Sequence, residues 1–232
     1  MSDERELAEI HERYRRRSAF APDRYSPFNP EALVRVQERQ RVMLRLLRNV
    51  GLRSIAGLDV IEVGCGSGGN LLELIGFGAD PTRLVGNELQ ADRIESVRER
   101  LPVAVRLHAG DATTLPLADA SFDVVLQSTV FSSILDAGLR QRLAASMWRW
   151  LRPGGGVLWY DFTVNNPANR DVAGVPLRVV RELFPQGAMT VRRLTLAPPV
   201  ARRVVAVHPS LYTVFSLLPP LRTHLLCWIK KP

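Results

Sequence analysis

Hydrophobic positions along the chain follow two periods, one typical of strands and one typical of helices. Short apolar runs with the character of buried strands occur at residues 58–63, 83–88, 103–108, 122–127 and 156–162. Segments with helical spacing lie at residues 31–50, 70–77, 90–101 and 139–151. Because strands and helices alternate, the pattern predicts a parallel sheet with helices on both of its faces.

The pattern changes in the last third of the chain. Residues 175–184 have helical spacing, and residues 189–196 and 223–231 are typical of strands. Between these two strands, residues 198–220 are apolar but interrupted by prolines. We therefore expect an inserted segment there, ahead of a last strand.

Composition places the chain among ordinary globular proteins. Its 232 residues are 46% hydrophobic and 23% charged, which argues against disordered, collagen-like and disulfide-rich classes. Only Cys65 and Cys227 are available for disulfides, which fits a reducing compartment. The first 17 residues alternate charges and lack the apolar stretch of a secretory signal, so we expect a cytoplasmic location.

The formal net charge of +8 lies in the last third of the chain. Residues 162–232 contain ten Lys and Arg but only two acidic residues, whereas the formal charges of residues 1–161 sum to zero. Such an excess favours an anionic acceptor, a nucleic acid or an anionic membrane surface. The alternative is a drift in composition, because 29 of the 31 basic residues are Arg.

The strongest motif is a glycine-rich turn directly after the first strand. It contains Gly64, Cys65 and Gly66, and Glu62 precedes it. Glycines at such a turn allow positive φ angles and let a ligand lie against bare backbone. Glu88 ends the next strand, where an acidic side chain binds ribose hydroxyls. Dinucleotides and S-adenosylmethionine are both bound in this way.

Four further blocks distinguish between these two cofactors. They occupy residues 108–112, 115–117, 121–125 and 151–156. In this order and spacing the chain closely resembles the class I S-adenosylmethionine-dependent methyltransferases. The resemblance implies an α/β, Rossmann-like fold with S-adenosylmethionine as cofactor. It implies a seven-stranded, mostly parallel sheet with helices on both faces and an antiparallel C-terminal strand.

The resemblance also implies roles for residues around the glycine turn. Glu62 and the turn Gly64, Cys65 and Gly66 would hold the methionine part of the cofactor. Cys65 has no redox or nucleophilic role in this interpretation. Capping of a helix or turn is the alternative role for Glu62.

Further along the chain, the resemblance assigns the adenosine contacts. Glu88 would bind the ribose hydroxyls and Leu89 would line the adenine. Asp111 would accept from the adenine amino group, with Ala112 contributing backbone contacts, although Asp111 is also suited to a turn. Gln127 would lie near the sulfonium and the acceptor.

The candidates for a general base are Asp161 and His208. Asp161 ends the fifth strand, where its carboxylate is expected to be exposed at the mouth of the site. His208 lies in the apolar insertion, and packing is its alternative role. Metal-dependent O-methyltransferases carry an Asp where this chain has Gln127, so we assign no metal.

Together these features predict methyl transfer from S-adenosylmethionine to a small-molecule or glycan-type acceptor, at oxygen. A lipid-linked, anionic glycan is one candidate, and residues 198–221 are candidates for peripheral membrane contact. RNA is disfavoured because the chain lacks interleaved aromatic and basic residues. RNA or quinone and lipid methylation, and a cofactor-binding module without catalysis, stay open as alternatives.

We expect four regions along the chain. Residues 1–30 would form an N-terminal helix and lid, and residues 31–196 the S-adenosylmethionine-binding core. Residues 197–221 would form a lid over the acceptor site, and residues 222–232 the last core strand.

Overall fold

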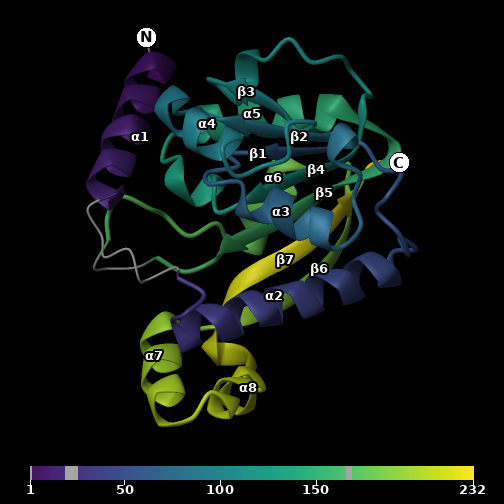
Figure 1. The fold of residues 1–232 in the computed structure, drawn as a ribbon. Helices are drawn as coiled ribbons and strands as arrows, with labels where there is room; N and C mark the ends of the chain where they lie inside the picture. The colour runs from purple at the N-terminus through teal and green to yellow at the C-terminus, as the bar shows by residue number, and fades with distance from the viewer. Residues whose placement is uncertain (1, 19–25, 166–168) are drawn as a thin grey trace.

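The computed structural model describes residues 2–18, 26–165 and 169–232. The strands of its sheet are β1 (Val60–Val63), β2 (Leu84–Glu88), β3 (Arg106–Ala109), β4 (Phe122–Ser128), β5 (Leu151–Phe162), β6 (Ala188–Leu196) and β7 (Arg222–Lys230). They form one sheet in the order β3-β2-β1-β4-β5-β7-β6 (Figure 1). The first five strands pair in parallel, and β7 is antiparallel to both β5 and β6.

Helices cover both faces of this sheet. The helices of the described residues are α1 (Ser2–Ser18), α2 (Pro30–Asn49), α3 (Gly69–Gly76), α4 (Ala91–Arg98), α5 (Ala137–Trp150), α6 (Leu177–Leu183), α7 (Pro198–Val207) and α8 (Ser210–Ser216), of which α2 to α6 lie on the faces. One core cluster joins the sheet to α2, α3 and α4, and a second joins the opposite face to α5 and α6. The fold class predicted from the sequence is therefore confirmed.

Two strands begin three or more residues away from their predicted starts. Residues 103–105 form a turn after Pro102, closed by a bond from the backbone N of Val105 to the O of Pro102 at 2.9 Å, so β3 begins only at Arg106. β5 instead begins five residues early, at Leu151. A Cβ atom at Gly155 would lie 2.7 Å from the O of Asp123, so glycine here permits close approach of β5 to β4.

The parallel strands β1, β2, β4 and β5 end at the same edge of the sheet. In open α/β sheets, ligands bind outside the carboxyl ends of the strands. The glycine turn follows β1 at this edge, and Glu88 is the last residue of β2. Figure 1 shows α1 apart from the two helical layers, at one side of the molecule.

The inserted segment between β6 and β7 forms a hairpin of two helices, α7 and α8. It packs against the end of β6 and the start of α2, below the sheet in Figure 1. Of residues 1–30, which were expected to form an N-terminal helix and lid, residues 1 and 19–25 lie outside the described residues. In the part of the chain that is described, no helix has both the length and the apolar character to cross a membrane.

Candidate cofactor and acceptor site

The glycine turn after β1 has a backbone that other residues rarely adopt. Gly64 and Gly66 have φ angles of +65° and +56°, where glycine is preferred. A Cβ atom at Gly64 would lie 2.6 Å from Cγ2 of Val130 in the turn after β4. A Cβ atom added at Gly66 would have no atom of the described residues outside the turn within 4 Å. One side of the turn is therefore bare backbone beside open space.

The carboxylate of Glu88 ties this turn to β2. Its Oε2 accepts a hydrogen bond from the backbone N of Gly66 at 2.9 Å, and its Oε1 accepts one from the backbone N of Gln90 at 3.1 Å. The residue is only 4% exposed. Each carboxylate oxygen keeps a second lone pair, so Glu88 can still accept hydrogen bonds from two ligand hydroxyls.

A pocket with about 540 Å³ of empty space lies beside Glu88 at the carboxyl ends of β1 and β2. Five of the predicted cofactor residues line it: Gly64, Glu88, Leu89, Asp111 and Ala112. Much of the remaining wall is apolar and comes from α1, the segment after β4 and α5: Leu7, Ile10, Tyr14, Val130, Ile134, Leu139 and Leu143. A carboxylate on one side and apolar walls on the other suit a ribose and a purine.

Helix α1 covers this pocket and is held by polar contacts at two places. Oε1 of Glu6 accepts from the backbone N of Leu135 at 2.8 Å and from Nη2 of Arg13 at 2.6 Å. Further along, Nη2 of Arg16 donates to Oδ1 of Asp171 at 2.6 Å. Ile10 between them is 4% exposed. The sequence predicts the helix, but no local pattern predicts its contacts more than 100 residues away.

The carboxyl group of Glu62 is buried and only half bonded. Its Oε1 accepts from Nδ2 of Asn70 at 2.5 Å, whereas its Oε2 has no partner among the described residues. Burial raises the pKa of this carboxyl to about 8, against the opposing effects of the Asn70 hydrogen bond and the Arg39 charge. A buried oxygen without a partner fits a cationic ligand group, such as an ammonium.

Asp111 has the turn role that the sequence offered as the alternative, and it also lies in the pocket wall. Its Oδ1 accepts from the backbone N of Thr113 at 2.8 Å and its Oδ2 from the Thr113 hydroxyl at 2.6 Å. It therefore caps the short helical turn Ala112–Thr114 while it lines the pocket. Ala112 is 7% exposed and closes the pocket beside it.

Cys65 and Gln127 do not reach the pocket wall. Cys65 is buried, and burial raises the pKa of its thiol well above the ordinary range. Gln127 is fully buried, with Nε2 donating to the O of Tyr160 at 3.4 Å and Oε1 accepting from the N of Val130 at 3.1 Å. Gln127 therefore stabilises the turn after β4, in which Val130 packs against Gly64, and it does not line the pocket.

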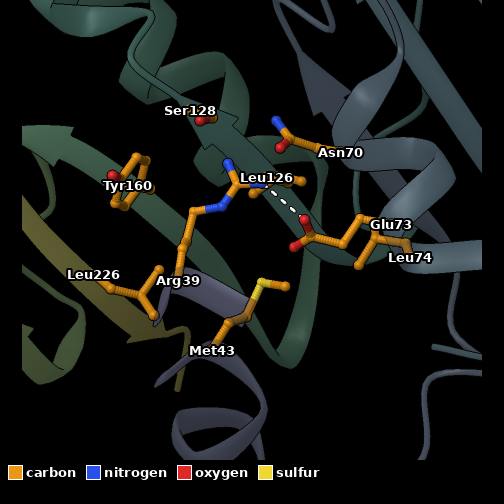
Figure 2. A pocket seen from close by; sticks show the side chains of 9 residues that line it. All are labelled: Arg39, Met43, Asn70, Glu73, Leu74, Leu126, Ser128, Tyr160 and Leu226. Carbon is orange, nitrogen blue, oxygen red and sulfur yellow. Dashed lines mark hydrogen bonds and ion pairs between the residues drawn. The ribbon is translucent and has the colours of Figure 1, made fainter. Parts of the chain in front are cut away.

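A second pocket, with about 280 Å³ of empty space, lies on the α2 and α3 face of the sheet (Figure 2). Arg39 reaches into it from α2, with Nη2 at 2.8 Å from Oε2 of Glu73 and its guanidinium carbon 5.5 Å from the centre of the Tyr160 ring. Asn70 lines the same pocket and bonds Glu62. Through Asn70, the second pocket adjoins the buried carboxyl of Glu62, just before the glycine turn.

Asp161 is not exposed at the mouth of the site, and that expectation is wrong. It is fully buried on the α5 face of the sheet, and burial raises the pKa of its carboxyl to about 7. Its Oδ2 accepts from the backbone N of Ser132 at 3.1 Å, and its Oδ1 from the N of Phe162 at 2.9 Å. Its visible role is to fix the turn after β4, and an acceptor would have to displace Ser132 to reach it.

The structure does not bring His208 to either pocket. It is exposed at the end of α7, and its Nδ1 accepts from the backbone N of Ser210 at 3.2 Å, which caps α8. Among the described parts of the chain, no cluster of three or more His, Cys, Asp or Glu side chains is placed to hold a metal ion.

His224, which the sequence pattern leaves aside, lies closer to the carboxyl edge. It opposes Phe162 at the end of β5, and its ring stacks on Tyr160 with centroids 5.0 Å apart. Burial lowers the pKa of this imidazole to about 3, so it is neutral at physiological pH. Alternation along β7 shows which residues share a face of the sheet with His224. Its stacking on Tyr160 could be predicted only if the pairing of β7 with β5 were known.

S-adenosylmethionine fits this set of groups. The unpartnered Oε2 of Glu62 suits the ammonium of the methionine part, and the bare backbone at Gly66 suits close approach of the chain. Glu88 and the pocket beside it suit the ribose and adenine. A dinucleotide would leave the buried Glu62 oxygen without a cation.

Comparisons with known proteins agree with this geometry. Residues 60–155 match a family model described as a methyltransferase domain. A sterol 24-C-methyltransferase of Gibberella zeae is 32% identical over 131 residues, which cover 54% of this chain and 33% of that protein. A phthiotriol/phenolphthiotriol dimycocerosates methyltransferase of Mycobacterium tuberculosis is 37% identical over 129 residues, covering 53% of this chain and 46% of that protein. The matched segment spans less than half of either relative.

Solved structures show the same fold over nearly the whole chain. The 1,6-didemethyltoxoflavin-N1-methyltransferase of Burkholderia thailandensis, with bound S-adenosylhomocysteine, superposes with a TM-score of 0.63 at 17% identity, covering 98% of this chain and 90% of its own. An S-adenosylmethionine-dependent methyltransferase of Archaeoglobus fulgidus superposes with a TM-score of 0.60 at 14% identity, covering 86% and 98%.

The sheet order is that of the Rossmann-like fold of these solved structures, and the glycine turn with Glu62 and Glu88 lies within the segment that matches the methyltransferase domain. Residues 60–155 therefore resemble the methyltransferase domains of that family, and the groups at their site fit S-adenosylmethionine as cofactor.

Proposed function

We propose that this protein transfers the methyl group of S-adenosylmethionine to a hydroxyl oxygen of a small, largely apolar molecule. The observation that carries the methyl-transfer part is the arrangement around Glu88, which holds the backbone of Gly66 and faces the pocket. When bound, the cofactor supplies an electrophilic methyl group on its sulfonium.

The protein's contribution to the reaction is to bind and align. Glu88, Leu89 and Ala112 would hold the adenosine, and Glu62 would hold the ammonium of the methionine part. Helix α1 would exclude water from the adenosine pocket through Ile10. Such alignment in a dry site is the main source of acceleration in a direct displacement.

The acceptor would approach from the side of β4 and β5, because the adenosine pocket occupies the side of β2 and β3. At the ends of β4, β5 and β7 lie Ser128, Phe162 and His224. The serine hydroxyl and the neutral imidazole can hydrogen-bond an uncharged hydroxyl, and aromatic rings pack against an apolar body. Thr129 next to them has a φ of +58°, a strained conformation often retained at ligand sites.

Transfer to oxygen forms a C–O bond, breaks the C–S bond and releases the hydroxyl proton. We place no general base among the described residues: Asp161 is buried behind Ser132, and His208 is remote from both pockets. The proton would leave to water as the bond forms, which favours acceptors with acidic hydroxyls, such as phenols.

The apolar class of acceptor, though not the transfer to oxygen, is also supported by two relatives, the sterol 24-C-methyltransferase and the phthiotriol/phenolphthiotriol dimycocerosates methyltransferase. The glycan-type acceptor suggested by charge is the second candidate. It is favoured less, because the basic residues of the last third lie mainly on outer surfaces: Arg192, Arg193, Arg202 and Arg203 are exposed.

A labelled-methyl assay tests this proposal. The protein is incubated with S-adenosylmethionine carrying a ¹³C methyl group and, in turn, a phenol, a sterol, a long-chain diol, a hexose and polyuridylate. We expect an O-methyl NMR signal with the phenol or the apolar alcohols. A signal on the hexose or on polyuridylate, or attached to carbon or nitrogen, would overturn the acceptor class. Binding of S-adenosylhomocysteine without transfer to any of them would support a non-catalytic module.

A further inference from the structure

The hairpin α7–α8 is attached to the rest of the molecule by one side only. Its inner side chains Ala201, Val205 and Tyr212 are buried with Leu196 of β6, and Val34 of α2 packs against them. The hydroxyl of Tyr212 also donates to Oε2 of Glu38 on α2 at 2.8 Å. The hairpin is therefore a firmly docked element with its other side free to meet a partner.

The outer side of the hairpin carries large apolar side chains that the fold leaves exposed. Val214, Leu217 and Leu218 are 55%, 69% and 52% exposed, and they lie in the last turn of α8 and directly after it. Val207, at the end of α7, is 78% exposed, and Phe28, just before α2, is 94% exposed. Single exposed apolar residues are ordinary, but a group on two adjoining elements marks an interaction surface.

Basic residues accompany these apolar side chains, and acidic residues do not. Arg202 and Arg203 are exposed on α7 itself. Residues 183–232 contain no Asp or Glu at all. On α2, Glu31 is buried and Glu38 is bonded to Tyr212 and to the backbone N of Thr195. The surface therefore combines positive charge with protruding apolar groups.

We propose that α7, α8 and the start of α2 form a docking surface for an anionic lipid bilayer. Val207, Val214, Leu217, Leu218 and Phe28 would enter the acyl boundary, while Arg202 and Arg203 would meet lipid phosphates. Charge complementarity alone would also suit RNA. The exposed aliphatic side chains favour a membrane, because RNA surfaces are recognised by stacking aromatics and by cations.

The docking surface adjoins the edge of the sheet at which the acceptor would enter. The hairpin connects the end of β6 to the start of β7, and His224 on β7 opposes Phe162 at the end of β5. A bound membrane would therefore face the acceptor side of the site, and an apolar acceptor could pass from the lipid phase without crossing water. This delivery step rests on the proposed function, whereas the docking itself does not.

Vesicle flotation of the full chain tests the docking surface. The probe is a set of phosphatidylcholine vesicles with or without about one third phosphatidylglycerol, at low and high salt. We expect binding only to the anionic vesicles, weakened by salt. The double variants L217E/L218E and R202E/R203E should each lower the bound fraction about tenfold or more. The first would place carboxylates at the acyl boundary, and the second would remove the cations that meet lipid phosphates.

Matched controls separate docking from misfolding and from the proposed function. V103E changes a fully exposed apolar residue in the turn before β3, and R100E changes an exposed Arg after α4, so both should bind vesicles like the parent chain. All variants should keep the parent affinity for S-adenosylhomocysteine. Three outcomes would overturn the membrane proposal, whether or not methyl transfer is found. The parent chain could bind neutral and anionic vesicles equally, or only the control variants could lose vesicle binding. R202E/R203E could also weaken binding of polyuridylate and leave vesicle binding unchanged.

Discussion

At the scale of single residues, the buried carboxyl of Glu62 is the group most sensitive to the cofactor. Its pKa is raised to about 8 because it is buried, and one of its oxygens has no partner. A ligand ammonium beside it favours the ionised form. The carboxyl should therefore pass from mostly protonated to ionised when the cofactor binds near neutral pH.

This change predicts proton release on cofactor binding. At pH 7, binding of S-adenosylhomocysteine should release close to one proton, measured by calorimetry in buffers of different ionisation enthalpy. The variant Glu62→Gln should release almost none. Asp161→Asn serves as the control, because Asp161 bonds Ser132 away from the pocket and its release should match the parent chain. Unchanged release in Glu62→Gln would contradict the assigned role of Glu62.

The position of a site residue could be predicted from the sequence where a motif determines the backbone conformation. It could not be predicted where the direction of the side chain determines whether the residue reaches the pocket. Glu88 and Gly64 could be predicted because a strand, a glycine turn and a second strand end together. Gln127 and Asp161 lie near strand ends as predicted, but their side chains bond the turn after β4 and do not line the pocket beside Glu88. Those bonds depend on a turn whose conformation includes the left-handed Thr129, which no sequence pattern indicates.

At the scale of elements, α1 is held over the cofactor pocket by a small number of polar contacts. Glu6 accepts from both the backbone N of Leu135 and the side chain of Arg13, and the side chains of this Glu and Arg are 9% and 6% exposed. Removing one partner of a buried pair leaves the other charge without compensation. The attachment of α1 should therefore depend strongly on Glu6.

We expect Glu6→Ala to release α1 without unfolding the sheet. Hydrogen exchange should accelerate in residues 2–18 and remain slow in β1, β4 and β5. Affinity for S-adenosylhomocysteine should fall about tenfold, a loss of ~1.4 kcal/mol, because the pocket loses the wall that contains Ile10 and Tyr14. Arg5→Ala removes only an exposed ion pair and should change neither quantity. Exchange in α1 equal to that of the parent chain would contradict this attachment.

The elements themselves follow from the hydrophobic pattern, but their long-range placement does not. The period of residues 31–50 predicts α2, and Asn29 caps it through its side chain. Nothing in residues 2–18 indicates that this helix lies over a pocket formed by residues 63–143. Likewise, the prolines in 198–220 indicate interruptions, whereas the helical hairpin there is stabilised by packing on Leu196 and Val34.

At the scale of the whole molecule, two buried carboxyls make stability depend on pH. Glu62 and Asp161 have pKa values raised by burial to about 8 and about 7. In the unfolded chain both ionise near pH ~4. Between these values the folded state binds more protons, so the free energy of unfolding falls as pH rises. Their contribution is complete below about pH 4 and is lost by about pH 8.

Urea unfolding at pH 5, 7 and 9 measures this dependence. We expect the cofactor-free protein to lose stability from pH 5 to pH 9, and the double variant Glu62→Gln, Asp161→Asn to lose clearly less. As a control, Glu99→Gln changes an exposed carboxyl after α4 and should leave the slope unchanged. A parent chain that gains stability over this range would contradict the burial of both groups in protonated form.

The central claim is that the pocket beside Glu88 binds S-adenosylmethionine. Calorimetric titration of S-adenosylhomocysteine and, separately, of NAD into the parent chain and the variant Glu88→Ala tests it most directly. We predict micromolar binding of S-adenosylhomocysteine, weakened by about 1.5–3 kcal/mol in the variant because hydrogen bonds to a charged group are lost, and no binding of NAD. Binding of NAD, or failure of the parent chain to bind S-adenosylhomocysteine, would contradict the claim.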